Sequence, residues 1–110
     1  MSAELLQTVA TTFGLLSATA RVHLIWLLAG GEQDVGSLAE DTGHSVATVS
    51  HHLSKLKLAG LVRSRREGKH QFYLLADDYV VDILGLALRH HQISDDKAPR
   101  RLDRAQRRRA

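Results

Sequence analysis

The stretch DVGSLAEDTGHSVATVSHHLSKLKLAGLVRSRREGKHQFYLL, residues 34–75, decides the fold. Apolar residues at helical spacing in its first half predict two short helices, over 35–41 and 46–58. The second half has the composition of two short strands, over 61–65 and 71–75. The stretch therefore predicts two helices joined by a tight turn and followed by a β-hairpin, which is the layout of a helix-turn-helix with a wing.

Local signals predict where these elements begin and end. Asp34 and Ser45 each precede a predicted helix and carry a side-chain oxygen that can accept a hydrogen bond from the first turn. Gly60 ends the second of these helices, and Gly68 supplies the positive φ that the hairpin turn over 66–69 requires. The order of elements is thus set by residues that lie within a few positions of each boundary.

Three further helices are predicted outside this stretch. Residues 3–15 repeat apolar side chains at helical spacing, and Ser17 is placed to cap a helix that runs to about Leu28. That second helix is apolar on most sides, which predicts a central core helix. The last helix, 77–91, is apolar on more than one face, so one face needs a partner such as a second copy. The predicted fold class is mainly α with a small β-hairpin.

Charge divides the chain into two predicted parts. Residues 97–110 carry seven of the 15 Lys and Arg against one acidic residue. We expect 95–110 to be a basic, flexible C-terminal tail, and 1–94 to be one winged helix-turn-helix domain for DNA binding and dimerisation. Within that domain, 55–69 holds six basic residues against Glu67 alone. This patch favours a polyanion partner, and the alternative is a solvated charged face.

Composition excludes several classes of protein. Cysteine is absent, so disulfides, thiolate metal sites and thiol redox switches are excluded. No apolar run reaches the ~18–20 residues of a membrane span and no signal peptide is present, so we expect a cytoplasmic protein without a membrane partner. The sequence has no phosphate-binding loop, HExxH motif or Ser/His/Asp spacing, which argues against an enzyme.

The helix 46–58 has the pattern that a DNA-reading helix needs. Short polar residues at its N-terminal end can contact base edges or phosphates. An apolar stripe, formed by Val46, Val49, Leu53 and Leu56, holds its other face. Basic residues of the hairpin turn would follow the backbone or the minor groove. The candidate DNA-binding residues are Ser45, Ala47, Thr48, Ser50, His51, Lys55, Arg65, Arg66 and Lys69. The alternatives are an ordinary α+β domain with a charged hairpin, or a protein–protein adaptor.

Three segments resemble the ArsR/SmtB family of bacterial winged-helix, metal-responsive transcriptional regulators. They are TVSHHLSKL at 48–56, AGLV at 59–62 and the hairpin 66–73. Residues 16–22 are similar to the segment that opens the second helix of the family. A Pro-Thr-Arg run is usual there, and only Arg21 of that run is present.

The resemblance covers about residues 5–93. It implies a homodimer joined through the helices 3–15 and 77–91, and a double-stranded DNA operator with an imperfect inverted repeat. It also implies a response to metal, usually as relief of repression. The sequence leaves open whether binding represses or activates transcription.

The family places its metal sites at two positions, and the matches here are partial. The stretch QDVGS at 33–37 stands where a Cys-x-Cys pair is used, and it has no thiol. On the last helix the family has Asp-x-His near the start and His-x-x-His or His-x-x-Glu near the end. Asp77 and His90 match this pattern, whereas Tyr79 and Ile93 replace the other two ligands.

The spacing of the matching residues requires two chains. Asp77 and His90 are 13 positions apart, which is roughly 20 Å along a helix, so they cannot share an ion within one chain. Two antiparallel copies would bring Asp77 of one beside His90 of the other. The candidate metal residues are Asp77, His90 and His91, and ligands of this kind without sulfur suit nickel, cobalt or zinc.

Two alternatives to a metal site remain open. His90 and His91 can be polar residues that favour the C-terminal end of a helix dipole. The regulator would then have no metal response of its own, with sensing lost or supplied by a separate sensor protein.

Overall fold

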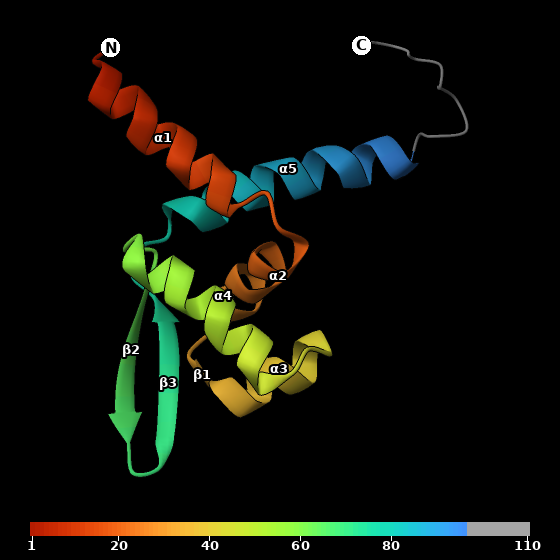
Figure 1. The fold of residues 1–110 in the computed structure, drawn as a ribbon. Coiled ribbons are helices and arrows are strands. Elements are labelled where there is room, and N and C mark those ends of the chain that lie inside the picture. The colour runs from red at the N-terminus through yellow and green to blue at the C-terminus, as the bar shows by residue number, and fades with distance from the viewer. Residues whose placement is uncertain (97–110) are drawn as a thin grey trace.

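The computed structural model describes residues 1–96, and it contains five α-helices and one three-stranded antiparallel sheet over that range (Figure 1). The elements are α1 (Ala3–Leu15), α2 (Thr19–Ala29), β1 (Gln33–Asp34), α3 (Val35–Thr42), α4 (Val46–Leu58), β2 (Val62–Glu67), β3 (His70–Leu75) and α5 (Tyr79–Asp96). The predicted order of helices and the hairpin is confirmed. The predicted tail over 95–110 lies outside the described residues except for its first two positions, which belong to α5.

Both predicted caps of the helix-turn-helix are present. The Asp34 carboxylate accepts a hydrogen bond from the Ser37 N–H at 2.9 Å, and the Ser45 hydroxyl oxygen accepts one from the Thr48 N–H at 3.1 Å. Gly43 ends α3 with a φ of 77°, a left-handed conformation that favours glycine. These contacts set the turn between α3 and α4 and therefore the direction of α4.

The predicted cap at Ser17 is wrong. The Ser17 hydroxyl donates to the Gly14 carbonyl at 2.6 Å, and Ala18 precedes α2 without a side-chain hydrogen bond. The carbonyls at the C-terminal end of α1 lack helical partners, so they compete for a hydroxyl that lies only three residues away. Ser17 thus closes α1 instead of opening α2.

The wing is longer than predicted and belongs to a three-stranded sheet. β2 and β3 pair from Val62 opposite Leu75 to Glu67 opposite His70, so only two residues remain for the turn. Gly68 has a φ of 62°, as its place in the turn requires. β1 pairs with β3 on the other edge, in the order β1-β3-β2. A strand of two residues has no periodic pattern, so the sequence did not predict it.

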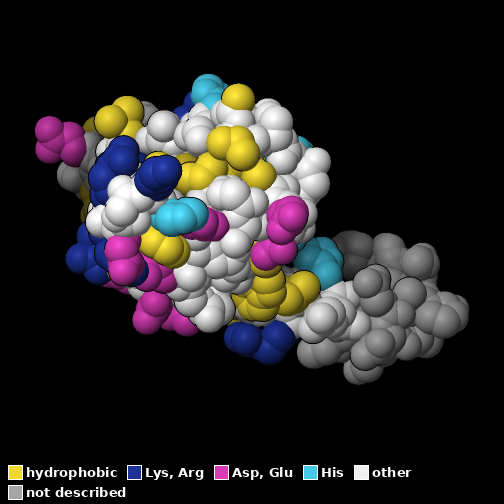
Figure 2. Space-filling model, turned by 90° about the horizontal axis from the view of Figure 1, so that it is seen from below, with side chains coloured by type: hydrophobic (Ala, Val, Ile, Leu, Met, Phe, Trp, Pro, Cys, Tyr) yellow, Lys and Arg dark blue, Asp and Glu magenta, His cyan; other side chains and the backbone are white. Residues whose placement is uncertain are grey.

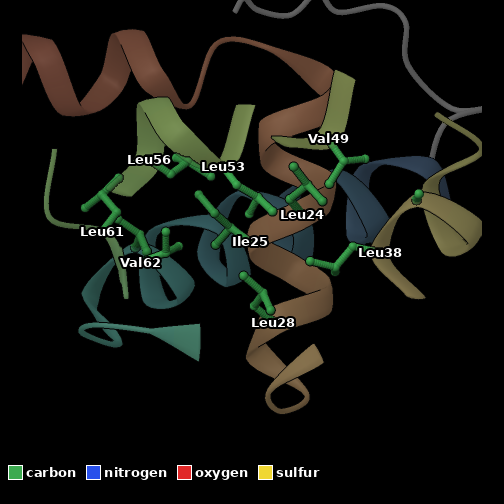
Figure 3. Packing of buried hydrophobic residues seen from close by; sticks show 11 residues of the cluster. Leu24, Ile25, Leu28, Leu38, Val49, Leu53, Leu56, Leu61 and Val62 are labelled. Carbon is green, nitrogen blue, oxygen red and sulfur yellow. The ribbon is translucent and has the colours of Figure 1, made fainter. Parts of the chain in front are cut away.

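The core lies where α2, α3, α4, β2 and α5 meet (Figure 3). Leu24 and Ile25 of α2 are fully buried, which confirms the prediction of a central core helix. Two residues differ from the prediction. Trp26 of α2 is 42% exposed, and Val46, which was expected on the apolar stripe of α4, is 53% exposed. The remaining core side chains are Leu28, Leu38, Ala39, Val49, Leu53, Leu56, Leu61, Val62 and Val80.

The helices α1 and α5 extend from the body at the end opposite the hairpin (Figure 1). α1 has no buried residue, and four of its large apolar side chains are exposed. They are Leu5, Leu6, Val9 and Phe13. Among residues 1–96, no single helix has the length and apolar character for a membrane span, and only α1 and α2 together, bent by 89°, meet that standard.

Candidate DNA interface

The N-terminal end of α4 is presented to solvent by the helix-turn-helix. Val49, Leu53 and Leu56 are buried on one side of α4, so the opposite side faces outward. The hydroxyls of Ser45 and Thr48 lie 3.0 Å apart at the exposed helix end. This end carries free backbone N–H groups and the positive pole of the helix dipole, a combination suited to phosphate or base-edge acceptors.

The other candidate residues of α4 run from this end to Lys55 in the last turn of the helix. Ala47, His51 and Lys55 are exposed, and Ser50 is half-buried. Val46 is also exposed here, and sequence reasoning missed it because its spacing matches the apolar stripe. An exposed aliphatic side chain beside short polar ones suits contact with a thymine methyl group. The structure therefore places Ser45, Ala47 and Thr48 at the N-terminal end of α4 together with Val46, whereas Lys55 lies in the last turn of the helix.

Arg65 of the wing is held by acidic side chains of the protein itself. Its guanidinium donates to both carboxylate oxygens of Glu32 at 2.7 Å and to Oε1 of Glu67 at 2.9 Å. The guanidinium also lies 4.8 Å from the centre of the Phe72 ring. The hydrogen bond from Arg65 lowers the pKa of Glu32, and the contact with Glu32 raises the pKa of Arg65. Its positive charge is therefore compensated in the free protein. Sequence reasoning missed Glu32 because that residue is 33 positions away.

Arg66 and Lys69 differ from Arg65. Within residues 1–96 neither has a carboxylate partner, and both are exposed. Figure 2 looks onto the end of the molecule that carries the hairpin, and it shows Lys and Arg side chains gathered on one side with acidic side chains beside them. The uncompensated positive charge of the wing turn comes from Arg66 and Lys69.

Two further contacts fasten the wing to the helix-turn-helix. The Lys57 ammonium at the end of α4 donates to the Ser64 hydroxyl at 2.7 Å. The His70 imidazole at the start of β3 lies 3.2 Å from the Asp34 carboxylate that caps α3. Hydrogen bonds from Ser37 chiefly lower the pKa of Asp34, and His70 lowers it further. The wing and α4 therefore form one surface whose parts are joined by polar side chains.

The candidate metal residues lie at opposite ends of α5. Asp77 precedes the helix, and its carboxylate accepts a hydrogen bond from the Tyr79 N–H at 2.9 Å. His90 and His91 are exposed near the other end, with ring centres 5.1 Å apart. Within the part of the chain that the structure describes, no group of three His, Cys, Asp or Glu could hold a metal ion. The donors that are described for one chain therefore do not by themselves form a metal site.

His91 also faces α2, an element that carries none of the candidate metal residues. It lines an apolar pocket of about 440 Å³ between α2 and α5, together with His23 and Trp26. The other residues of this pocket are Thr19, Val22, Leu84, Ala87 and Leu88. The spacing of the lining residues shows that the pocket runs between one face of each helix.

Comparisons with known proteins agree with this geometry. Residues 19–64 match the family model described as bacterial regulatory protein, arsR family. The chain is 43% identical over 72 residues to the HTH-type transcriptional regulator KmtR of Mycobacterium tuberculosis, covering 66% of this chain and 55% of KmtR. It is 38% identical to a Staphylococcus aureus homologue of the cadmium resistance regulatory protein CadC, covering 76% of this chain and 70% of that protein. The chain thus spans about half the length of KmtR.

Solved structures give the same result. The homodimeric winged helix-turn-helix DNA-binding domain of Mb0332 from Mycobacterium bovis, a possible ArsR-family regulator, matches with a TM-score of 0.72 and 36% identity. The match covers 87% of this chain and 85% of that one. The fold and its exposed α4 define a winged helix-turn-helix protein. The chain belongs to the ArsR/SmtB family of bacterial transcriptional regulators, whose members are DNA-binding proteins and not enzymes.

Proposed function

We propose that this protein is a cytoplasmic, sequence-specific DNA-binding regulator that acts as a homodimer on an inverted-repeat operator. The observation that carries this proposal is the exposed N-terminal end of α4, with Ser45 and Thr48 at its tip and the opposite face buried in the core. The remaining residues proposed to contact DNA are Ala47, Ser50, His51, Lys55, Arg65, Arg66 and Lys69. Repression and activation are both compatible with this geometry.

The homodimer is supported by the free apolar surface of α1. A helix of 13 residues with no buried side chain gains little from packing within its own chain. The exposed apolar faces of α1 and α5 lie at the end of the molecule opposite the wing (Figure 1). Joining two copies there would leave both α4 helices free, as an inverted-repeat operator requires.

The first experiment replaces two candidate base contacts at once. We would select an operator from random DNA and measure its affinity for wild type and for Thr48→Ala with His51→Ala. We expect the double variant to lose specific affinity by about tenfold to a hundredfold while keeping its non-specific affinity. The matched control, Thr19→Ala with His23→Ala, makes the same truncations on α2, away from α4 and from α1. Unchanged operator affinity in the first variant would remove α4 as the reading helix.

We further propose that a divalent metal such as nickel or zinc regulates this activity from the seam between the α5 helices of two copies. The proposal is supported by the imidazole and carboxylate donors, by the exposure of Asp77, His90 and His91, and by the cadmium-resistance relative. A site formed by two chains is supported by the spacing of Asp77 and His90, which lie at opposite ends of α5. The competing possibility is a regulator without its own metal response, with a partner protein as the sensor.

Calorimetric titration distinguishes these possibilities. We expect wild type to bind nickel or zinc in a fixed ratio, and Asp77→Ala and His90→Ala each to lose that binding. His44→Ala removes an exposed histidine from the α3–α4 turn and serves as the control. Operator affinity is measured with and without the metal. Binding that survives both substitutions, or binding that leaves operator affinity unchanged, would favour the regulator without a metal response.

A further inference from the structure

Arg21 connects the end of α1 to the DNA-reading helix. It lies in the first turn of α2, and its side chain is half-buried. Its Nε donates to the carbonyl of Leu15, the last residue of α1, at 2.7 Å. Its Nη1 lies 3.2 Å from Nδ1 of His52 on α4. One planar guanidinium thus contacts two residues, Leu15 and His52, that are 37 positions apart in the sequence.

The chemistry of this contact fixes the state of His52. A guanidinium has only donors, so Nδ1 of His52 must accept, and the imidazole is neutral with its proton on Nε2. Burial is the main cause that lowers the pKa of His52 below its ordinary value of 6.5. The positive groups that face it lower this pKa further. They are Arg21 of α2, His51 and Lys55 of α4, and His44 of the α3–α4 turn.

The position of His52 makes this contact relevant to DNA. His52 is half-buried, whereas the neighbouring His51 is exposed among the candidate DNA contacts. The two rings meet edge to face with centres 5.6 Å apart. The Arg21 contact therefore holds the inner side of α4 directly behind a side chain proposed to touch DNA.

The other end of the contact lies on the element proposed to form the dimer. No residue of α1 is buried in the chain, so its position relative to the body depends on contacts near its end. Leu15 lies at that end and is half-buried against the core. A shift of α1 would move the Leu15 carbonyl relative to Arg21.

We propose that Arg21 is a positioning residue for DNA reading, which couples the end of α1 to the orientation of α4 through the Leu15 carbonyl and His52. This rests on the proposed function, because it assumes that α4 reads DNA and that α1 joins the dimer. Arg21 acts through His52 and need not touch DNA itself. Protonation of His52 would turn its acceptor into a donor facing a cation and would break the contact.

The test uses the full chain and three single variants at neutral pH. Arg21→Lys keeps the positive charge but cannot direct separate nitrogens in a fixed plane to both acceptors. His52→Ala removes the acceptor, and His52→Gln keeps an acceptor that does not titrate. We expect Arg21→Lys and His52→Ala to lose about tenfold in operator affinity, the scale of one hydrogen bond to a charged group. His52→Gln should stay near wild type.

A pH series separates positioning from simple structural support. We would measure the ratio of operator to non-specific affinity from about pH 8 to about pH 5, because the general gain of positive charge cancels in that ratio. The wild-type ratio should fall as His52 takes up a proton, and the ratio for His52→Gln should not. The same fall in both proteins would overturn the role of His52.

A measurement without DNA keeps this proposal distinct from the proposed function. Nuclear magnetic resonance of the imidazole nitrogens should show His52 with its proton on Nε2 and a pKa below 6.5 in wild type, with the tautomer preference lost in Arg21→Lys.

Folded Arg21→Lys and His52→Ala that keep full operator affinity would overturn the coupling alone. If Arg21→Lys does not fold, the comparison of His52→Ala with His52→Gln gives the same decision. A wild-type protein with this tautomer but no preferred DNA sequence would overturn the proposed function and the coupling with it.

Discussion

Arg65 has the charge and the hairpin position expected of a DNA contact, but in the free protein it already binds acidic side chains of its own chain. Its sequence position in the hairpin predicts a phosphate contact, but its guanidinium is bound by Glu32 and Glu67 and lies over Phe72. A phosphate would have to compete with two carboxylates that already accept its hydrogen bonds. Arg66 does not face that competition within residues 1–96.

This difference predicts separate salt dependences for two neighbouring arginines. Arg66→Ala should flatten the slope of log affinity against log salt by about one, because one phosphate contact is lost. Arg65→Ala should flatten that slope by less, because Arg65 can bind a phosphate only by giving up hydrogen bonds to Glu32 and Glu67. The slopes are measured by fluorescence anisotropy with the selected operator. Equal flattening in both variants would show that Arg65 exchanges its carboxylates for phosphate on binding.

At the scale of elements, α4 depends on a cap that also lies at the candidate DNA surface. The Ser45 hydroxyl accepts from the Thr48 N–H and lies 3.0 Å from the Thr48 hydroxyl, so both hydroxyls are engaged in the free protein. The cap was predictable because it acts over three residues. The role of Ser17 was not predictable, because its hydroxyl lies within three residues of both helices and can hydrogen-bond to the end of α1 or to the start of α2.

The cap gives a prediction for stability. Ser45→Ala should lower the free energy of unfolding by about 1 kcal/mol, because the Thr48 N–H loses its acceptor at the helix start. Ser45→Asn supplies another capping oxygen and should stay close to wild type. Urea denaturation followed by circular dichroism measures both values. A stable Ser45→Ala protein would mean that the turn from α3, closed by Gly43, is sufficient to begin α4.

At the scale of the whole molecule, the two ends have different surfaces. One end carries α4 and the wing, with polar and basic side chains, and the other carries α1 and α5 with exposed apolar side chains. Val9 and Phe13 of α1 are 42% and 54% exposed. A chain of this size gains stability from burying such a surface, and a second copy supplies a matching one.

A charge on α1 should therefore change the assembly and not the fold. Val9→Glu is expected to convert a dimer to a monomer at micromolar concentration while the core stays folded, since no residue of α1 is buried in the chain. Val46→Glu makes the same substitution at an exposed valine on α4 and should remain dimeric. Sedimentation velocity gives the assembly state, and thermal unfolding gives the stability. A Val9→Glu dimer would place the interface elsewhere.

The amino-acid sequence by itself determined the elements of this protein and their order. Helical periodicity, the caps at Asp34 and Ser45 and the glycine of the hairpin turn act over a few residues, so they can be read without a fold. The wing pairing was predictable for the same reason, although its length and the third strand were not.

Only the tertiary structure decided which side chains share a partner. The Arg65–Glu32 pair and the Arg21–His52 contact join residues 33 and 31 positions apart, and no local pattern marks them. The folded chain also leaves Val46 exposed despite its place in the apolar stripe. These features depend on how helices and strands pack against one another, and packing is set by contacts between residues that are distant in the sequence.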